Sequence, residues 1–168
     1  ITMDNVWSYW ITQGPLYYLM AQLAWNPDKD GETVMNDYYK PAFGQAAEQV
    51  EAYWNHLEQA RSEITHGGTP WTEAFDKTCF ERGYVILKRA EAQVAGKDEI
   101  YAKRLEYVTA GLDFLRLSTE NLTLCRRLKK TEGEDDEAYR KAEANWEKIV
   151  DIGRRYPSAL NKNHVKWN

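Results

Sequence analysis

Residues 98–130 read DEIYAKRLEYVTAGLDFLRLSTENLTLCRRLKK, and apolar side chains recur in this stretch at alternating steps of four and three. Such spacing is typical of a helix that packs nearly parallel or antiparallel to its neighbours. The first apolar set is Tyr101, Leu105, Val108, Leu112, Leu115, Thr119 and Leu122. The second is Tyr107, Phe114, Leu117, Leu124 and Leu128. Because two sides are apolar, we expect one long helix at the centre of the fold.

Shorter amphipathic segments lie on both sides of this helix. Gly14-Pro15 predicts a helix start, because proline is tolerated in the first turn of a helix. Asn26-Pro27 predicts the end of that helix, because the residue before a proline disfavours helical angles. The further helices are expected at about 32–42, 45–65, 69–95 and 134–155. The pattern therefore predicts an all-α fold, an up-and-down bundle of about five to six helices with an extended N-terminal lead-in. We divide the chain into a lead-in at 1–13, the bundle at 14–160 and a polar tail at 161–168.

Composition narrows the functional classes. The 168 residues suit one domain, and a net charge of -4 with a single basic run at Arg126-Arg127 and Lys129-Lys130 does not favour nucleic acid. No apolar stretch approaches the ~20 residues that span a bilayer. Cys79 and Cys125 are expected to be small apolar core residues that form no disulfide with each other, since Cys125 would lie ~16 Å beyond the residue opposite Cys79. The three histidines have no ligand-like spacing, and His56 is expected at the surface.

The loop after the first helix has a partial calcium-binding pattern. Asn26, Asp28, Asp30, Gly31 and Asp37 match positions one, three, five, six and twelve of an EF-hand loop. Asn stands at the first position, however, and Asp instead of a bidentate Glu at the last. The alternative, which we favour, is a polar connection whose Asp side chains cap the following helix. No cofactor is expected, and no complete catalytic set is visible.

The lead-in is rich in aromatic residues. Trp7, Tyr9 and Trp10, with Gln13 nearby, combine flat apolar faces with hydrogen-bonding groups, a mixture that suits a sugar ring. We treat these four residues as candidates for a position close to substrate. The alternative, which we favour, is that the rings pack the bundle against another domain.

The first third of the chain resembles a known family. The segment 14–44, GPLYYLMAQLAWNPDKDGETVMNDYYKPAFG, is similar to the stretch that follows the catalytic barrel in the mostly bacterial DUF4838 family and its relatives among α-glucuronidases and hexosaminidase-like hydrolases. The residues that carry the resemblance are Tyr17, Tyr18, Leu23, Trp25, Asn26, Pro27, Asp28, Asp37, Tyr38, Tyr39, Phe43, Gly44, Ala46, Ala47 and Tyr53. The later helices match only in their general character.

The resemblance implies a C-terminal helical domain of a larger carbohydrate-active protein. Its catalytic carboxylates would lie on an upstream barrel, which the helices would buttress, and the parent would be secreted, periplasmic or at the cell surface. The partners expected are that barrel, carbohydrate near the lead-in and a second copy in a homodimer, with neither nucleic acid nor membrane. Two alternatives stay open: an independent helical interaction module and a small carbohydrate-binding domain.

Overall fold

The computed structural model describes residues 10–62, 64 and 70–157, and every regular element within them is helical. The all-α prediction is confirmed. The helices are α1 (Trp10–Trp25), α2 (Gly31–Phe43), α3 (Ala47–Ser62), α4 (Trp71–Ala74), α5 (Lys77–Val94), α6 (Glu99–Lys130) and α7 (Asp136–Arg155). A short 3₁₀ turn, Gly44–Ala46, joins α2 to α3.

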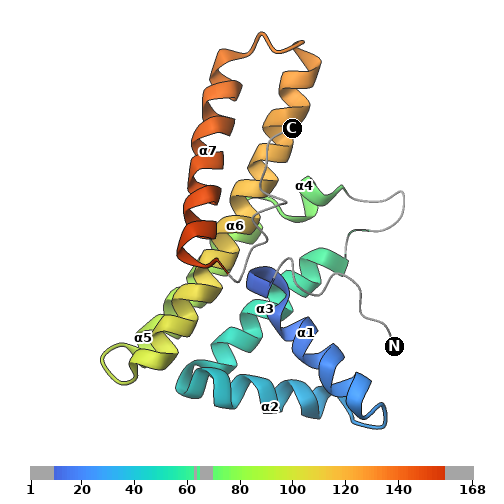
Figure 1. Cartoon of the computed structure of the whole chain (residues 1–168), viewed down its shortest axis with the longest axis vertical. Coiled ribbons are helices and arrows are strands. Elements are labelled where there is room, and N and C mark those ends of the chain that lie inside the picture. The colour runs from blue at the N-terminus through green and yellow to red at the C-terminus, as the bar shows by residue number, and fades with distance from the viewer. Residues whose placement is uncertain (1–9, 63, 65–69, 158–168) are drawn as a thin grey trace.

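The long helix α6 is the axis of the molecule (Figure 1). α5 runs antiparallel along its first half, and α7 returns antiparallel along its second half. α3 packs on α5, and the C-terminal end of α2 lies close to the turn between α5 and α6. α1 begins against the middle of α6 and packs along α2. The middle of α6 is thus covered from several sides, which explains why its sequence is apolar on more than one face.

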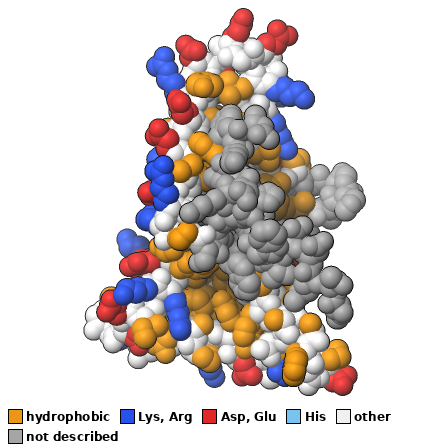
Figure 2. Space-filling model, viewed as in Figure 1, with side chains coloured by type: hydrophobic (Ala, Val, Ile, Leu, Met, Phe, Trp, Pro, Cys, Tyr) orange, Lys and Arg blue, Asp and Glu red, His pale blue; other side chains and the backbone are white. Residues whose placement is uncertain are grey.

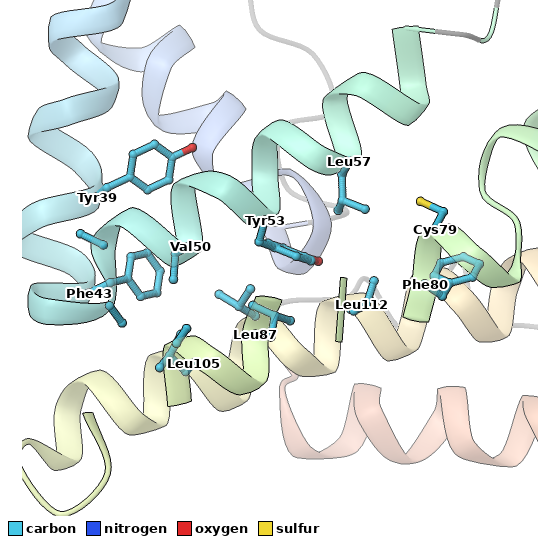
Figure 3. Close-up of a cluster of buried hydrophobic side chains, with 14 of the residues drawn as sticks. Tyr39, Phe43, Val50, Tyr53, Leu57, Cys79, Phe80, Leu87, Leu105 and Leu112 are labelled. Atoms are coloured by element: carbon cyan, nitrogen blue, oxygen red, sulfur yellow. The ribbon is translucent and has the colours of Figure 1, made fainter. Parts of the chain in front are cut away.

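The main hydrophobic core lies between α2, α3, α5 and the first half of α6 (Figure 3). Tyr53 and Val50 of α3 meet Leu87 of α5 and Leu105 and Leu112 of α6, all buried to 2% exposure or less. Two smaller clusters lie between α6 and α7, one around Ile149 and Ile152 and one around Leu124. The core is therefore concentrated at one end of α6.

Close backbone contact joins α1 to α6. Pro15 has no N–H, so the carbonyl of Ile11 four residues earlier receives no helical hydrogen bond from it. This carbonyl oxygen lies against Gly111 of α6 so closely that a methyl group on Gly111 would overlap it. Pro15 and Gly111 therefore affect the same point, where α1 crosses α6: the proline leaves the Ile11 carbonyl without its helical donor, and the glycine gives that carbonyl room.

The first helix begins earlier than the sequence predicted. Residues 10–13 are helical, whereas the sequence predicted an extended lead-in up to residue 13 and a helix start at Gly14-Pro15. Proline does not begin α1 but lies inside it, where the Ile11 carbonyl loses its helical hydrogen bond while the buried Ile11 side chain packs in the cluster between α6 and α7. Residues 1–9 of the lead-in lie outside the described residues.

The expected helix at 69–95 is two helices. α4 ends at Ala74, and α5 begins at Lys77 after Asp76, whose carboxylate accepts a hydrogen bond from the Cys79 amide at 2.7 Å. Aspartate favours this capping position because it satisfies an amide that has no helical partner. A periodic apolar pattern runs through the break, and the Asp76 cap is what separates the two segments.

Candidate functional site

The predicted sugar-facing residues do not form a described site. Trp7 and Tyr9 lie outside the described residues. Trp10 is the first residue of α1, and Gln13 is exposed one turn further along the same helix. The substrate-proximal role of these four residues stays a prediction.

The calcium-like loop is organised by its own hydrogen bonds. Asn26 Oδ1 accepts from the Asp28 amide at 3.1 Å, and Asp30 Oδ2 accepts from the amide and hydroxyl of Thr33 at 2.8 and 2.9 Å. Asp30 is the N-cap of α2, and these bonds from Thr33 hold the pKa of its carboxyl below the ordinary value. Asp37 is exposed within α2. Within the described residues, no three His, Cys, Asp or Glu side chains are grouped as metal ligands.

Two expectations about single residues are wrong. His56 is half-buried rather than at the surface, with Nε2 2.8 Å from the carbonyl oxygen of Cys79 and 3.5 Å from its thiol. The reason is that α5 packs directly on this side of α3. Cys79 is buried as expected, but Cys125 is exposed, because the second half of α6 is covered mainly by α7 and contributes Leu124 and Leu128 to the apolar cluster there.

The surface of α1 is unusually apolar. The sixteen residues of this helix, WITQGPLYYLMAQLAW, include no charged side chain. Four residues on one side are nevertheless exposed at helical spacing, and Trp25 follows at the helix end with 90% of its surface exposed. We call these residues the α1 face: Gln13, Leu16, Met20, Ala24 and Trp25.

The α1 face is mostly apolar, although it is the solvent-exposed side of the helix. Leu16 is 51% and Met20 38% exposed. An amphipathic surface helix turns polar residues outward, and a helix apolar all round is normally buried. Hydrophobic side chains gather over the end of the molecule where α1 and α2 lie (Figure 2). The α1 face is therefore a candidate docking surface.

A polar network crosses the middle of α6 and connects three helices. Tyr84 of α5 donates its hydroxyl hydrogen to Asp113 at 2.5 Å and accepts from Arg116 Nε at 3.1 Å. Arg116 Nη1 donates to Glu120 Oε1 at 2.9 Å. Asn145 of α7 donates to the other oxygen of Glu120 at 3.0 Å. We call these five residues the Arg116 network.

The ionisation of the network follows from its contacts. Burial, together with the hydrogen bond to Asp113, raises the pKa of Tyr84 to about 12, so its hydroxyl remains a donor at neutral pH. Burial alone would lower the pKa of Arg116, but the hydrogen bond to Tyr84 and the charge of Glu120 outweigh this and raise it. The network therefore holds a charged guanidinium in a half-buried position between α5 and α7.

Two adjoining hollows share Arg116 as a lining residue. One, of about 500 Å³, lies between α4, α5 and α6, with Lys141 of α7 at its edge. The other, of about 420 Å³, lies between α6 and α7. We call the larger of the two the Arg116 groove.

Sequence reasoning missed the Arg116 network. It assigned no role to Asp113 or Glu120, yet both are half-buried and hydrogen-bonded to neighbouring helices. A signal was present, because Asp113, Arg116 and Glu120 share one side of a long helix whose other sides carry the apolar repeat. Their partners Tyr84 and Asn145 are distant in sequence, so no local pattern could identify them.

Comparison with protein-family models, curated proteins and solved structures found no match to this chain. In the part of the chain that the structure describes, no helix is both long and apolar enough to cross a membrane. The α1 face and the Arg116 groove are the two surface features of the described residues that bear on function.

Proposed function

We propose that this chain is a non-catalytic helical domain of a larger carbohydrate-active protein, and that its α1 face packs against the upstream catalytic barrel. One observation carries the proposal: a helix without charged residues exposes Leu16, Met20 and Trp25. The sequence resemblance supports this proposal, because Trp25 is among the residues that carry the resemblance and the resemblance implies an upstream barrel as the neighbour.

The energetics of the α1 face favour a protein neighbour. Full burial of one large apolar side chain contributes roughly 1.5–3 kcal/mol. Leu16, Met20 and Trp25 together could therefore contribute several kcal/mol, and Trp is among the residues enriched at the centres of interfaces. A neighbour in the same polypeptide would form this contact with little loss of translational entropy, which opposes association between separate chains.

The Arg116 network fits a supporting role. Each of its carboxylates accepts a hydrogen bond from within the network, and the bonds join α5, α6 and α7. A satisfied network of this kind fixes the relative positions of helices. A domain that shapes a neighbouring pocket needs this rigidity more than it needs reactive groups.

Association between separately produced domains tests the proposal. The chain would be mixed with the polypeptide encoded immediately upstream in its reading frame, and binding measured by calorimetry. We expect binding that the double variant Leu16→Glu/Met20→Glu weakens at least tenfold. Val85→Glu is the matched control, because Val85 has the same 51% exposure as Leu16 but lies on α5.

Two results would overturn the proposal. One is an upstream region that encodes no barrel. The other is equal binding by wild type, the α1 double variant and the Val85 control. Sedimentation of the chain alone gives a separate outcome: a dimer disrupted by Leu16→Glu/Met20→Glu would assign the α1 face to a second copy instead.

A further inference from the structure

The Arg116 groove has more hydrogen-bond donors available than its formal charges suggest. Around the larger hollow, three cations, Lys77, Arg116 and Lys141, balance three carboxylates, Asp76, Glu81 and Glu120. The carboxylates, however, already have partners. Asp76 accepts the Cys79 amide, Glu81 pairs with Lys77 at 3.6 Å, and Glu120 accepts from Arg116 and Asn145.

Two of the three cations, Arg116 and Lys141, keep hydrogen-bond donors without an acceptor among the described residues. Arg116 uses Nε and Nη1 in the network, and its Nη2 has no acceptor among the described residues. Lys141 forms no ion pair with any residue that the structure describes. Because a guanidinium presents several N–H donors, Nη2 of Arg116 keeps donors that can bind a carboxylate oxygen.

Network bonds also hold Arg116 in place before any ligand arrives. Tyr84 Oη and Glu120 Oε1 engage two of its nitrogens from different helices, at 3.1 and 2.9 Å. A side chain that is already ordered loses less conformational entropy on binding. The pairing with Glu120 reduces the net charge at this point, so we expect modest affinity with strong dependence on ligand geometry.

The floor of the larger hollow is apolar. Phe75, Phe80 and Leu124 line it, each buried to 8% exposure or less within the protein. Arg116 and Lys141 are therefore beside a surface that favours hydrocarbon. We propose that the Arg116 groove binds a small amphipathic carboxylate, with the carboxylate on Arg116 and Lys141 and the apolar body over Phe75, Phe80 and Leu124.

The test uses 3-phenylpropionate as the probe. Its binding to the full chain would be followed by two-dimensional amide NMR, with 3-phenylpropanamide as the neutral analogue of the same shape. We expect saturable shifts centred on residues around Arg116 and Lys141, and at least tenfold weaker binding of the amide. Lys141→Gln should weaken the acid by about fivefold, in line with roughly 1 kcal/mol for one exposed charge pair.

Variants separate binding from folding. Arg116→Gln should abolish the shifts, and its spectrum shows directly whether the fold is retained. If this variant unfolds, Lys141→Gln carries the test, since Lys141 is exposed and outside the network. Lys88→Gln on α5 is the control and should bind as the wild type does. Absence of saturable shifts, equal binding of acid and amide, or an unchanged affinity in Lys141→Gln would overturn the proposal. The α1 face plays no part in this experiment.

Discussion

Gly111 is the residue at which α1 and α6 come closest. A methyl group there would overlap the Ile11 carbonyl oxygen, which belongs to the backbone and has little room to move. Alanine normally stabilises a helix by up to ~1 kcal/mol over glycine, whereas overpacking costs ~1–3 kcal/mol. We therefore expect Gly111→Ala to lower the free energy of unfolding by about 1–2 kcal/mol, as measured by urea denaturation.

Gly153 of α7 provides the matched control. It is also helical and buried, but a methyl group there would meet no atom of the described residues within 4 Å. Gly153→Ala should therefore be neutral or stabilising by up to ~1 kcal/mol. Equal effects of the two substitutions would show that the contact between Ile11 and Gly111 does not limit the packing of α1.

Single residues also mark the limit of what sequence could predict about the site. Tyr84 was absent from every expected site, although it donates to Asp113 and accepts from Arg116. The sequence distance between Tyr84 and these partners is spanned only when α5 and α6 pair. Hydrophobic periodicity describes which side of one helix is apolar, and it contains no information on which polar groups meet across two helices.

At the scale of elements, the caps determine where helices begin. Asp135 is the N-cap of α7: its carboxylate accepts from the Ala138 amide at 3.0 Å and pairs with Arg127 of α6. The Ala138 amide, together with Arg127, holds the pKa of Asp135 below the ordinary value for aspartate. The cap thus also joins the two helices at their turn.

The lowered pKa predicts a pH dependence. A carboxyl whose pKa is lower in the folded state stabilises the fold above its unfolded pKa, and the effect is lost as pH falls through the folded pKa. We expect the thermal midpoint to decrease below about pH 4, where aspartate begins to protonate. Asp135→Asn, which can still cap but does not titrate, should show a smaller decrease. An identical pH profile for this variant and the wild type would contradict the assigned role of Asp135.

Helix existence was predictable at this scale, and helix boundaries were less so. The expected helix at 98–130 agrees with α6 because its apolar repeat is long and Asp98 provides a strong N-cap. The predicted start of the first helix was wrong, and the prediction of one continuous helix at 69–95 missed the break between α4 and α5. In both cases a tertiary contact or a single cap overrode the local signal: Ile11 against Gly111, and Asp76 on the Cys79 amide. Leu122, the last residue of the first apolar set, was expected to pack against a neighbouring helix, but it is 40% exposed.

At the scale of the whole molecule, support along α6 is uneven. Its first half contacts α1, α2 and α5, and contributes Leu105, Val108 and Leu112 to the main core. Its second half forms a hairpin with α7 that extends away from the other helices (Figure 1). The cluster inside the outer part of this hairpin consists of Leu124, Ala138 and Ala142, with Leu128 packed beside them. One continuous helix therefore belongs to two environments of different packing density.

This difference predicts where the chain opens first. Local unfolding follows low contact density, so amides at 120–130 and 136–144 should exchange hydrogen faster than amides at 105–117. Leu124→Ala should enhance the contrast, because removing a buried leucine side chain costs ~2–5 kcal/mol and the outer hairpin has few other apolar contacts. Amides of α3 and α5 should keep their wild-type exchange rates, since Leu124 is not part of their core. Hydrogen exchange followed by mass spectrometry would measure this. Uniform protection along α6, or an equal effect of Leu124→Ala on α3, would show instead that the hairpin and the main core unfold as one cooperative unit.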